Sequence, residues 1–465
     1  MDQRWPQYVQ SMTITPENQR PRVDEEAIKY VLFSAREHDV KFVRLWFTDI
    51  LGTLKGFAIT VDELEGVLRG GASFDGASIE GLTRADESDL IAMPDPSTFQ
   101  VLPWRPSKDA VARLFCDIET PTGEPSAADG RQVLRRNLVR SSEMGLTFYV
   151  APEIEYYYDT GVAGGDDNSN RSGYFDQTSI DGTGADLRRD TVLTLEQMGI
   201  PVKHSHHEVG VGQHEIDLRH TNALTMADSI ITFKVVAKEI AAPTGAHATF
   251  MPRPFGDRHG SGMHTHISLF RGDDNAFFDA DAERHLSETG RQFIAGLMRH
   301  AADICVVTNQ WINSYKRLIP GLEAPVFASW TKGNFGDLIR VPSYRPGREE
   351  SVRVEYRAPD PAANPYLLFS VLLAAGLDGI DKKLTLPEPL DDDVYVMSDS
   401  ELDKHGVSRL PRTLDEAIRL AEKSELLETA LGSTVKANFL ANKRLEWEEF
   451  STTVTDYELA RYRHL

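Results

Sequence analysis

The segment Arg353-Val354-Glu355-Tyr356-Arg357 constrains the fold more than any other part of the chain, because it alternates charged and apolar residues. As a β-strand it places both arginines and the carboxylate on one face of a sheet, with the two apolar residues on the other. Three charges on an inward-facing side of a sheet are costly to bury unless they serve ligands of opposite charge. The segment therefore predicts a sheet whose inner face lines a cavity for a polyanion and a metal ion.

Three further segments carry charged groups at similarly close spacing. They contribute Glu153 and Glu155, Glu208 and Glu215, and His264 and His266. A mixed set of carboxylates and imidazoles suits Mg²⁺ or Mn²⁺ better than zinc. Together with the arginines, these groups describe the cavity walls that an ATP- and metal-dependent ligase needs.

Each of these features also has an ordinary structural interpretation. Two glutamates spaced as Glu153 and Glu155 more often lie on a solvated strand face, although the aromatic run Tyr156–Tyr158 predicts a buried strand here. The two histidines at 264 and 266 are about as consistent with satisfied structural residues as with ligands. The segment 320–325 is either an exposed loop or a flap that brings Glu323 over the site as a base.

The composition narrows the possible partners. The 465 residues include 50 lysines and arginines against 71 aspartates and glutamates, a formal net charge of −21. Nucleic acid is therefore not an expected partner, because phosphate binding needs a basic surface. Two cysteines, Cys116 and Cys305, exclude a disulfide framework and favour a reducing compartment. With no secretory signal visible and no apolar run near the roughly 20 residues of a membrane helix, we expect a cytoplasmic protein with no membrane partner.

The order of expected elements indicates a mixed α+β chain. Residues 1–22 are expected to be a flexible leader, and a helix at 23–40 and a hairpin of strands at 41–48 and 53–60 open a first unit that ends at residue 115. Further strands are expected at 146–158, 201–209, 214–220, 262–269, 333–341 and 352–358. Helices are expected at 130–143, 186–198, 224–241, 288–305, 364–382, 414–431 and 435–450. This irregular mixture does not indicate a doubly wound parallel sheet.

Seven motifs, in this order, make the chain resemble the glutamine synthetase family of type I over roughly residues 25–460. They are FTDILG at 47–52, FDGASIEG at 74–81, PEIE at 152–155, SHHEVGVGQHE at 205–215, GSGMHTH at 260–266, NSYKRLIPGLEAP at 313–325 and RVEYRAPDPAANPYL at 353–367. The resemblance implies a β-grasp domain at 23–115 and a catalytic half-barrel of antiparallel strands with helices at 116–465. It also implies a homo-oligomer, a dodecamer of two hexameric rings with active sites between subunits.

The resemblance further implies a role for each site residue. Two divalent metals, Mg²⁺ or Mn²⁺, would be held by Glu155, Glu208 and Glu215 and by Glu153, His264 and Glu355. Glutamate would be bound by Arg317 and Arg357, with His266 and Gly260 beside it. ATP phosphates would face Arg340 and Arg353, and Arg340 would also act in catalysis. Glu323 and Asp49, the latter from the next subunit, would bind and deprotonate the incoming amine.

The implied reaction has two steps. The γ-carboxylate of glutamate attacks ATP to give γ-glutamyl phosphate, and an amine then displaces the phosphate. Metals and arginines neutralise charge on the transferred phosphoryl group. A closed flap excludes the water that would hydrolyse the acyl phosphate.

The sequence departs from the family pattern at three places. Phe335 stands where an arginine near phosphate is usual, and Asp337 adds a negative charge nearby. His259 precedes Gly260 where ammonia-using members commonly have asparagine. The segment 383–387 lacks the tyrosine that is adenylylated in some bacterial members, so that control is not expected.

With these departures, the sequence does not identify the amine that accepts the glutamyl group. Stretches such as RLWFTDILG resemble the actinobacterial branch that glutamylates polyamines and other amines. We therefore favour an organic amine as acceptor, forming a γ-glutamylamide, with conventional glutamine synthesis from ammonia as the alternative. A catalytically weakened regulatory or structural oligomer is the alternative of another class, and a guanidine kinase is a third possibility.

Overall fold

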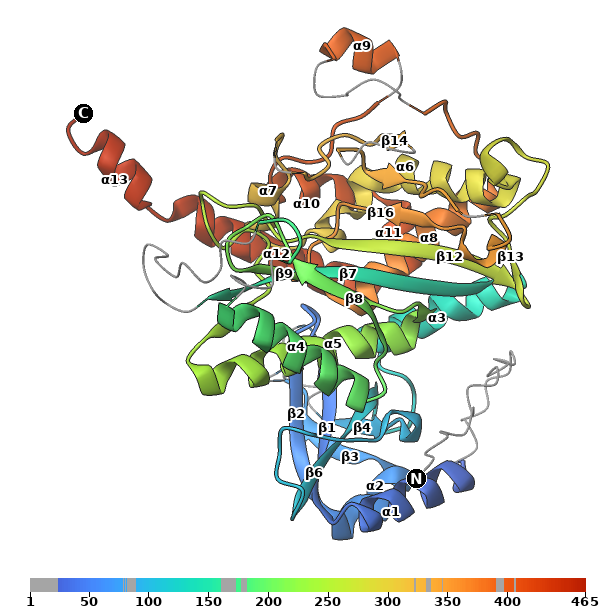
Figure 1. Cartoon of the computed structure of the whole chain (residues 1–465), viewed down its shortest axis with the longest axis vertical. Helices are drawn as coiled ribbons and strands as arrows, with labels where there is room; N and C mark the ends of the chain where they lie inside the picture. The colour runs from blue at the N-terminus through green and yellow to red at the C-terminus, as the bar shows by residue number, and fades with distance from the viewer. Residues whose placement is uncertain are drawn as a thin grey trace.

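The computed structural model describes residues 24–77, 79, 81, 89–159, 173–176, 182–321, 323–331, 336–344, 346–389, 397–404 and 407–465. The expected leader and Phe335 lie outside the described residues. Figure 1 shows two tiers, a small N-terminal sheet below and a larger sheet with helices above and below it.

The N-terminal tier is a sheet with two helices packed on it. Its strands are β1 (Val40–Thr48), β2 (Leu54–Thr60), β3 (Ala72–Asp75), β4 (Asp89–Pro94), β5 (Gln100–Val101) and β6 (Ala110–Glu119). In space they run β2-β1-β6-β4-β3, with β5 beside β6. Helix α1 (Glu25–Glu37) begins at Asp24, whose carboxylate accepts hydrogen bonds from two backbone amides of the first turn. Helices α1 and α2 (Leu64–Gly70) bury an apolar side that includes Val31 and Leu64.

The boundary expected between residues 115 and 116 falls inside β6. Residues on both sides of it pair within the same sheet, since Leu114 pairs with β1 and Ile118 with β4. We propose instead a junction after Glu119, because dividing β6 would break one continuous hydrogen-bonded ladder.

The upper tier is built on a curled, mostly antiparallel sheet. Its strands are β7 (Thr147–Asp159), β8 (Val202–His207), β9 (Gln213–Leu218), β10 (Thr221–Asn222), β11 (His247–Thr249), β12 (Met263–Arg271), β13 (Asp274–Asn275), β14 (Trp330–Thr331), β15 (Ile339–Arg340) and β16 (Val354–Tyr356). The main path runs β14-β15-β16-β12-β7-β9-β8. The long strand β7 also pairs with β10 and β11, so it joins the largest number of neighbours.

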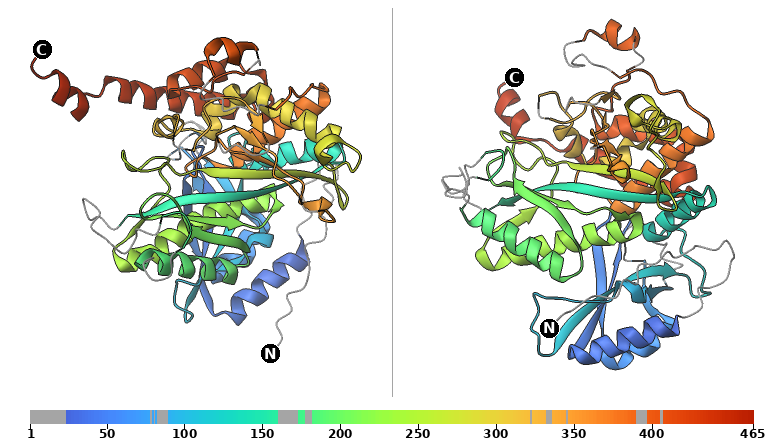
Figure 2. Two further views of the ribbon diagram at one scale, coloured as in Figure 1. Left: turned by 45° about the horizontal axis from the view of Figure 1, so that its top comes forward. Right: turned by 45° about the vertical axis from the view of Figure 1, so that its right-hand side comes forward.

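Helices enclose this sheet and support its strands. They are α3 (Gly130–Glu143), α4 (Gly182–Gln197), α5 (Ala223–Ala241), α6 (Glu288–Thr308), α7 (Ser314–Arg317), α8 (Pro365–Asp381), α9 (Asp399–Lys404), α10 (Leu414–Glu422), α11 (Glu425–Leu431), α12 (Ser433–Thr452) and α13 (Asp456–Tyr462). Helix α8 is apolar on nearly every side and packs against α3, α5, α6 and α11. In the left view of Figure 2, α12 and α13 extend away from the body of the molecule. Within the described ranges, no helix is both long and apolar enough to cross a bilayer.

The architecture confirms the expected α+β class, with a β-grasp domain followed by a half-barrel sheet and helices. Three expected elements need correction. Within the described residues, the strand expected at 333–341 is only Ile339–Arg340. The strand expected at 352–358 is confined to Val354–Tyr356, so Arg353 and Arg357 flank it. The helix expected at 414–431 is two helices, because the Ser424 hydroxyl caps the start of α11 by accepting a hydrogen bond from the Leu427 amide.

Candidate active site

Strand pairing brings the charged residues of distant segments side by side. Glu153 of β7 lies opposite His264 of β12, and Glu155 lies opposite Glu215 of β9. On the far side of β12, His266 lies opposite Glu355 of β16. Cross-strand neighbours in an antiparallel ladder have Cβ atoms about 4.5–5.5 Å apart. The register therefore creates one acidic and imidazole-rich surface across four strands.

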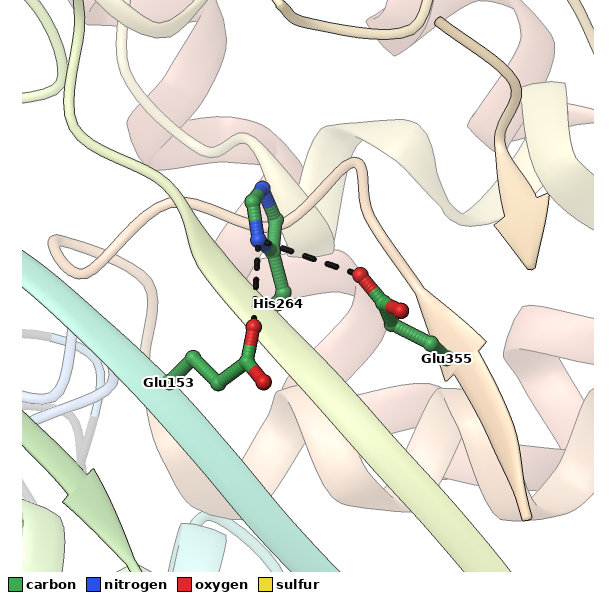
Figure 3. A group of neighbouring side chains, drawn as sticks. All are labelled: Glu153, His264 and Glu355. Atoms are coloured by element: carbon green, nitrogen blue, oxygen red, sulfur yellow. Dashed lines mark ion pairs between the residues drawn. The ribbon is translucent and has the colours of Figure 1, made fainter. Parts of the chain in front are cut away.

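The first group on this surface consists of Glu153, His264 and Glu355. His264 Nδ1 lies 3.5 Å from Glu153 Oε2 and 4.0 Å from Glu355 Oε1. Figure 3 shows both carboxylates directed at this imidazole nitrogen. One ligand atom from each residue lies within 4.8 Å of the other two, so the group has the geometry to hold a metal ion.

The second group consists of His206, Glu208 and Glu215, again with ligand atoms within 4.8 Å of one another. His206 Nε2 lies 3.1 Å from Glu215 Oε1, and His206 Nδ1 lies 3.5 Å from Glu208 Oε1. Burial, and then the nearby charge of Glu155, raise the pKa of Glu208 to about 8 and raise that of Glu215 well above its usual value. A divalent cation bound between buried carboxylates that repel one another would stabilise their ionised forms.

Glu155 lies between the two groups. Its Oε2 accepts hydrogen bonds from Gln213 Nε2 at 3.1 Å and from the Gly262 amide at 3.0 Å, and its Oε1 lies 3.9 Å from His264 Nε2. The residues expected to hold one metal were Glu155, Glu208 and Glu215. The structure places the latter two with His206 and fixes Glu155 beside them.

Two details of the cavity fit a bound cation. His264 Nε2 is buried and accepts or donates no hydrogen bond among the described residues. A Cβ added at Gly262 would lie 2.6 Å from Arg317 Nη2, 2.9 Å from His264 Nε2 and 3.1 Å from Glu155 Oε1. The glycine thus leaves open the space where these three polar groups converge.

The arginines of the opening motif contact the first group. Arg340 Nη1 lies 2.8 Å from Glu355 Oε2, and Arg357 donates to Glu355 Oε1. Burial opposes ionisation of Glu355, but His266 and Arg357 outweigh it and lower the pKa of this carboxyl. Glu355 therefore stays ionised between two guanidinium groups.

Arg353 acts on the first group through His266. Arg353 Nε donates to His266 Nδ1 at 3.2 Å, which leaves His266 Nε2 to donate to Glu153 Oε1 at 2.6 Å. This chain fixes the tautomer and the orientation of the imidazole. His266 therefore orients a carboxylate of the candidate metal group.

Arg317 and Gly260 form the opposite wall. The Arg317 guanidinium is buried and donates to the carbonyl oxygens of Ala358 at 2.7 Å and Arg357 at 3.2 Å. A Cβ at Gly260 would lie 2.7 Å from the Pro252 carbonyl oxygen and 2.8 Å from Arg317 Cγ. Arg317 thereby ties the residues after β16 to the glycine segment before β12.

Glu323 lines the same cavity as Glu155, Glu208 and Arg317. It is exposed and has a positive φ of 54°, an uncommon conformation for a residue with a side chain. Glu323 therefore places an exposed carboxylate at the mouth of the cavity.

Asp49 is the one expected site residue that none of these contacts joins to the two metal-capable groups or to the residues around them. It lies in the turn between β1 and β2, where its Oδ1 accepts hydrogen bonds from the amides of Leu51 at 3.0 Å and Thr53 at 2.8 Å. Its Oδ2 lies 3.6 Å from Lys55 Nζ. Burial raises the pKa of Asp49 despite these partners.

Several residues of the site were missed by the sequence reasoning. The motif at 205–215 contains His206 but assigns it no role, although its register opposite Glu215 makes it a partner of that carboxylate. Gln213, which bonds Glu155 and the Gly260 carbonyl, gave no signal in the sequence. The rings of Tyr174 and Phe175 pack edge-on against His206, with the Phe175 and His206 ring centroids 5.1 Å apart.

The departures from the family pattern have different positions. His259 lies in the cavity wall with Glu155, Glu208 and Glu323. Asp337 is fully buried just before β15. Phe335 lies outside the described residues, so the loss of a positive charge near phosphate that it implies stays a prediction.

The chain matches two family models that together span most of its length. The model described as "Glutamine synthetase, catalytic domain" matches residues 127–462, and "Glutamine synthetase, beta-Grasp domain" matches residues 39–121. The glutamine synthetase of Mycobacterium tuberculosis H37Rv is 51% identical over 444 residues, covering 94% of this chain and 99% of the relative. That of Clostridium saccharobutylicum is 45% identical over 430 residues, covering 92% and 96%.

Solved structures agree with these matches. A GmaS/ADP complex superposes with a TM-score of 0.84 at 30% identity, over 94% of this chain and 99% of that chain. Plasmodium falciparum glutamine synthetase gives a TM-score of 0.84 at 24% identity, over 94% and 98%, and supports the fold alone. The chain therefore belongs to the glutamine synthetase family, whose members are ATP- and divalent-metal-dependent ligases that form a carbon–nitrogen bond on glutamate.

Proposed function

We propose that the protein makes glutamine from glutamate and ammonia with ATP. The observation that carries this proposal is that two groups with metal-binding geometry lie side by side on one surface, with Glu155 between them. Arg340 and Arg357 both contact Glu355 of the first group. The sequence favoured an organic amine. The relatives that are about half identical over nearly their whole length are instead named plainly as glutamine synthetases, which favours ammonia.

Mg²⁺ or Mn²⁺ would be held by Glu153, His264 and Glu355 and by Glu208, Glu215 and His206, with Glu155 as a shared neighbour. Bound there, the ions would supply positive charge to ATP phosphates and to the transferred phosphoryl group. The protein's own part is to hold these carboxylates ionised and oriented, which His266 does for Glu153 and the two arginines do for Glu355.

The arginine side chains around the metal groups would bind or position the substrates. Arg340 and Arg353 lie at the edge of the first group, where they would face phosphate oxygens. Arg357 would bind a glutamate carboxylate, while Arg317 holds the backbone of that wall in place and the small residue Gly260 permits close approach. A guanidinium fork suits both phosphate and carboxylate.

Glu323 would close over the cavity and accept a proton from ammonium, while excluding water from γ-glutamyl phosphate. We propose that Asp49 reaches a neighbouring subunit's cavity, since its own turn lies away from the cavity of its chain. This requires a homo-oligomer with sites between subunits, for which we propose the dodecamer of two hexameric rings.

An organic amine is the second candidate. The exposed rings of Tyr174 and Phe175 lie beside His206, next to the acidic group, where they could cover an alkyl chain on the nitrogen. Aromatic faces also attract alkylammonium ions.

A single assay distinguishes the two candidates. ADP release would be measured with glutamate, Mg²⁺ and ATP, in the presence of ammonium, methylamine, ethanolamine, putrescine, spermine or aniline, with formation of the amide confirmed by mass spectrometry. We expect the highest kcat/KM with ammonium. Turnover confined to one organic amine would replace the first candidate by the second. Calorimetry that detects no binding of Mg²⁺-ATP would instead support a weakened, non-catalytic oligomer.

A further inference from the structure

A second cavity lies away from the acidic surface, between the turn that follows β1, helix α5 and strand β11. It encloses about 350 Å³, within the range of about 300–1,000 Å³ typical of small-molecule sites. Its lining residues share no member with those around Glu155, Glu208 and Glu323. It is therefore a separate site candidate.

The charged residues that line this cavity are all basic. Lys234 and Lys238 lie one turn apart on α5, so they project from the same side of the helix, and His247 of β11 adds an imidazole. Among the residues that the structure describes, no aspartate and no glutamate lines this cavity. In a chain of net charge −21, such a local excess of cations is unusual.

Neither lysine forms an ion pair with any residue that the structure describes, since no carboxylate oxygen of those residues lies within 4.0 Å of either ammonium. Lys234 Nζ has one long hydrogen bond, to the Ala363 carbonyl oxygen at 3.5 Å. Lys238 Nζ lies 5.9 Å from the centre of the Phe250 ring, which also lines the cavity. Burial, followed by the charge of Lys238, lowers the pKa of Lys234 to about 8, and the charge of Asp360 offsets this shift only in part.

The rest of the wall is apolar. Ile231 and Val235 come from α5, Phe250 and Met251 follow β11, and Trp311 lies between α6 and α7. An inorganic ion would leave these side chains in contact with water. A ligand with an apolar body and one anionic end would cover them and reach the lysines at the same time.

We propose that this cavity binds a small organic carboxylate, whose charged end lies between Lys234 and Lys238 and whose apolar body packs on Phe250, Met251 and Trp311. This site goes beyond the proposed ligase reaction. Its wall includes Leu51 and Thr53, whose amides hold Asp49, so a bound ligand contacts the turn that positions this carboxylate.

The experiment is calorimetry on the full-length protein at pH 7 with benzoate, and with benzamide as its uncharged counterpart. We expect benzoate to bind and benzamide to bind at least tenfold more weakly. Lys234→Met and Lys238→Met should each weaken benzoate binding at least tenfold. Lys423→Met, which removes the same charge from an exposed position after α10, should leave it unchanged.

Equal binding of benzoate and benzamide, unchanged affinity in both lysine variants, or no benzoate binding up to millimolar concentration would each overturn the proposal. If Lys234→Met lowers the melting temperature, Lys238→Met still decides the outcome, because Lys238 is exposed and its loss is not expected to disturb the fold. The titration contains no ATP or glutamate, so its result does not depend on whether the ligase reaction is confirmed.

Discussion

Gly262 shows how a missing side chain can serve a site. Because a Cβ at this position would lie only 2.6 Å from Arg317 Nη2 and 2.9 Å from His264 Nε2, Gly262→Ala must displace one of them. We expect at least a tenfold loss of Mn²⁺ affinity, measured by calorimetry, with unchanged circular dichroism.

The matched control is Gly66→Ala in α2, where no atom lies within 4 Å of the added Cβ. We expect this variant to keep wild-type affinity and to gain up to about 1 kcal/mol of stability. Equal metal affinity in wild type and Gly262→Ala would show that the space beside His264 is not used by a cation.

Glu208 gives a prediction for the metal-free protein. Its folded-state pKa of about 8 lies above the ordinary glutamate value, so the folded state keeps a proton that the unfolded state has released. This contribution to stability is complete below about pH 4.3 and is lost as pH rises to about 8. The melting temperature in EDTA should therefore fall across this window, and Mg²⁺ should reverse the fall, because the cation replaces the proton.

Glu208→Gln is the control for this titration, since it keeps the size of the side chain and cannot ionise. Thermal scans of this variant in EDTA should show a smaller decline than wild type over the same pH range. An identical decline in both proteins would assign the pH dependence to other groups.

At the scale of elements, one buried arginine pairs with carboxylates of both the β-grasp domain and the catalytic domain. Arg131 of α3 lies 2.8 Å from Asp95, 2.6 Å from Asp117 and 2.9 Å from Asp228, measured between nitrogen and oxygen. Arg131→Met would leave these carboxylates without their main counter-charge. We expect a loss of about 3–5 kcal/mol in urea unfolding, the usual cost of breaking a buried ion pair.

Arg189→Met serves as the comparison, because Arg189 is exposed and, within the described part of the chain, its ion pair is with its exposed neighbour Asp190. Its effect should stay within about 0.5 kcal/mol. If both variants unfold at the same urea concentration, the Arg131 network does not hold the two domains together.

The elements also show what could be predicted from sequence. The alternation of Arg353–Arg357 and the spacing of Glu153 and Glu155 depend on the two-residue period of a strand, which is local. The pairing of β8 with β9, which brings His206 to Glu215, depends on contacts between strands, and no single segment encodes it. The end of β16 at Tyr356 likewise follows from tertiary contacts, since the Arg357 amide turns to the Leu338 carbonyl oxygen.

At the scale of the whole molecule, the position of Asp49 leads to a test of the assembly. If Asp49 serves a neighbour's cavity while Glu323 serves its own, Asp49→Ala and Glu323→Ala should each be inactive alone. Subunits of the two variants assembled together should regain about a quarter of wild-type activity, because a head-to-tail interface then contains both intact residues in about one site in four.

Co-expression with two affinity tags, followed by tandem purification, provides the mixed oligomers for this assay. Mixed oligomers that remain inactive would place both residues in the cavity of one chain. The motif around Asp49 predicted its role only through the family resemblance, because sequence alone does not contain the geometry of a second copy.

The central position of β7 also limits how the gene can vary. Glu153 and Glu155 face one way only while the strand keeps its register with β9 and β12. Deleting a single codon within Thr147–Asp159 would turn every later side chain of the strand to the opposite face, whereas loops outside the sheet can absorb such changes. Insertions and deletions among homologous genes should therefore be absent from the codons of β7, even where substitutions in them are tolerated.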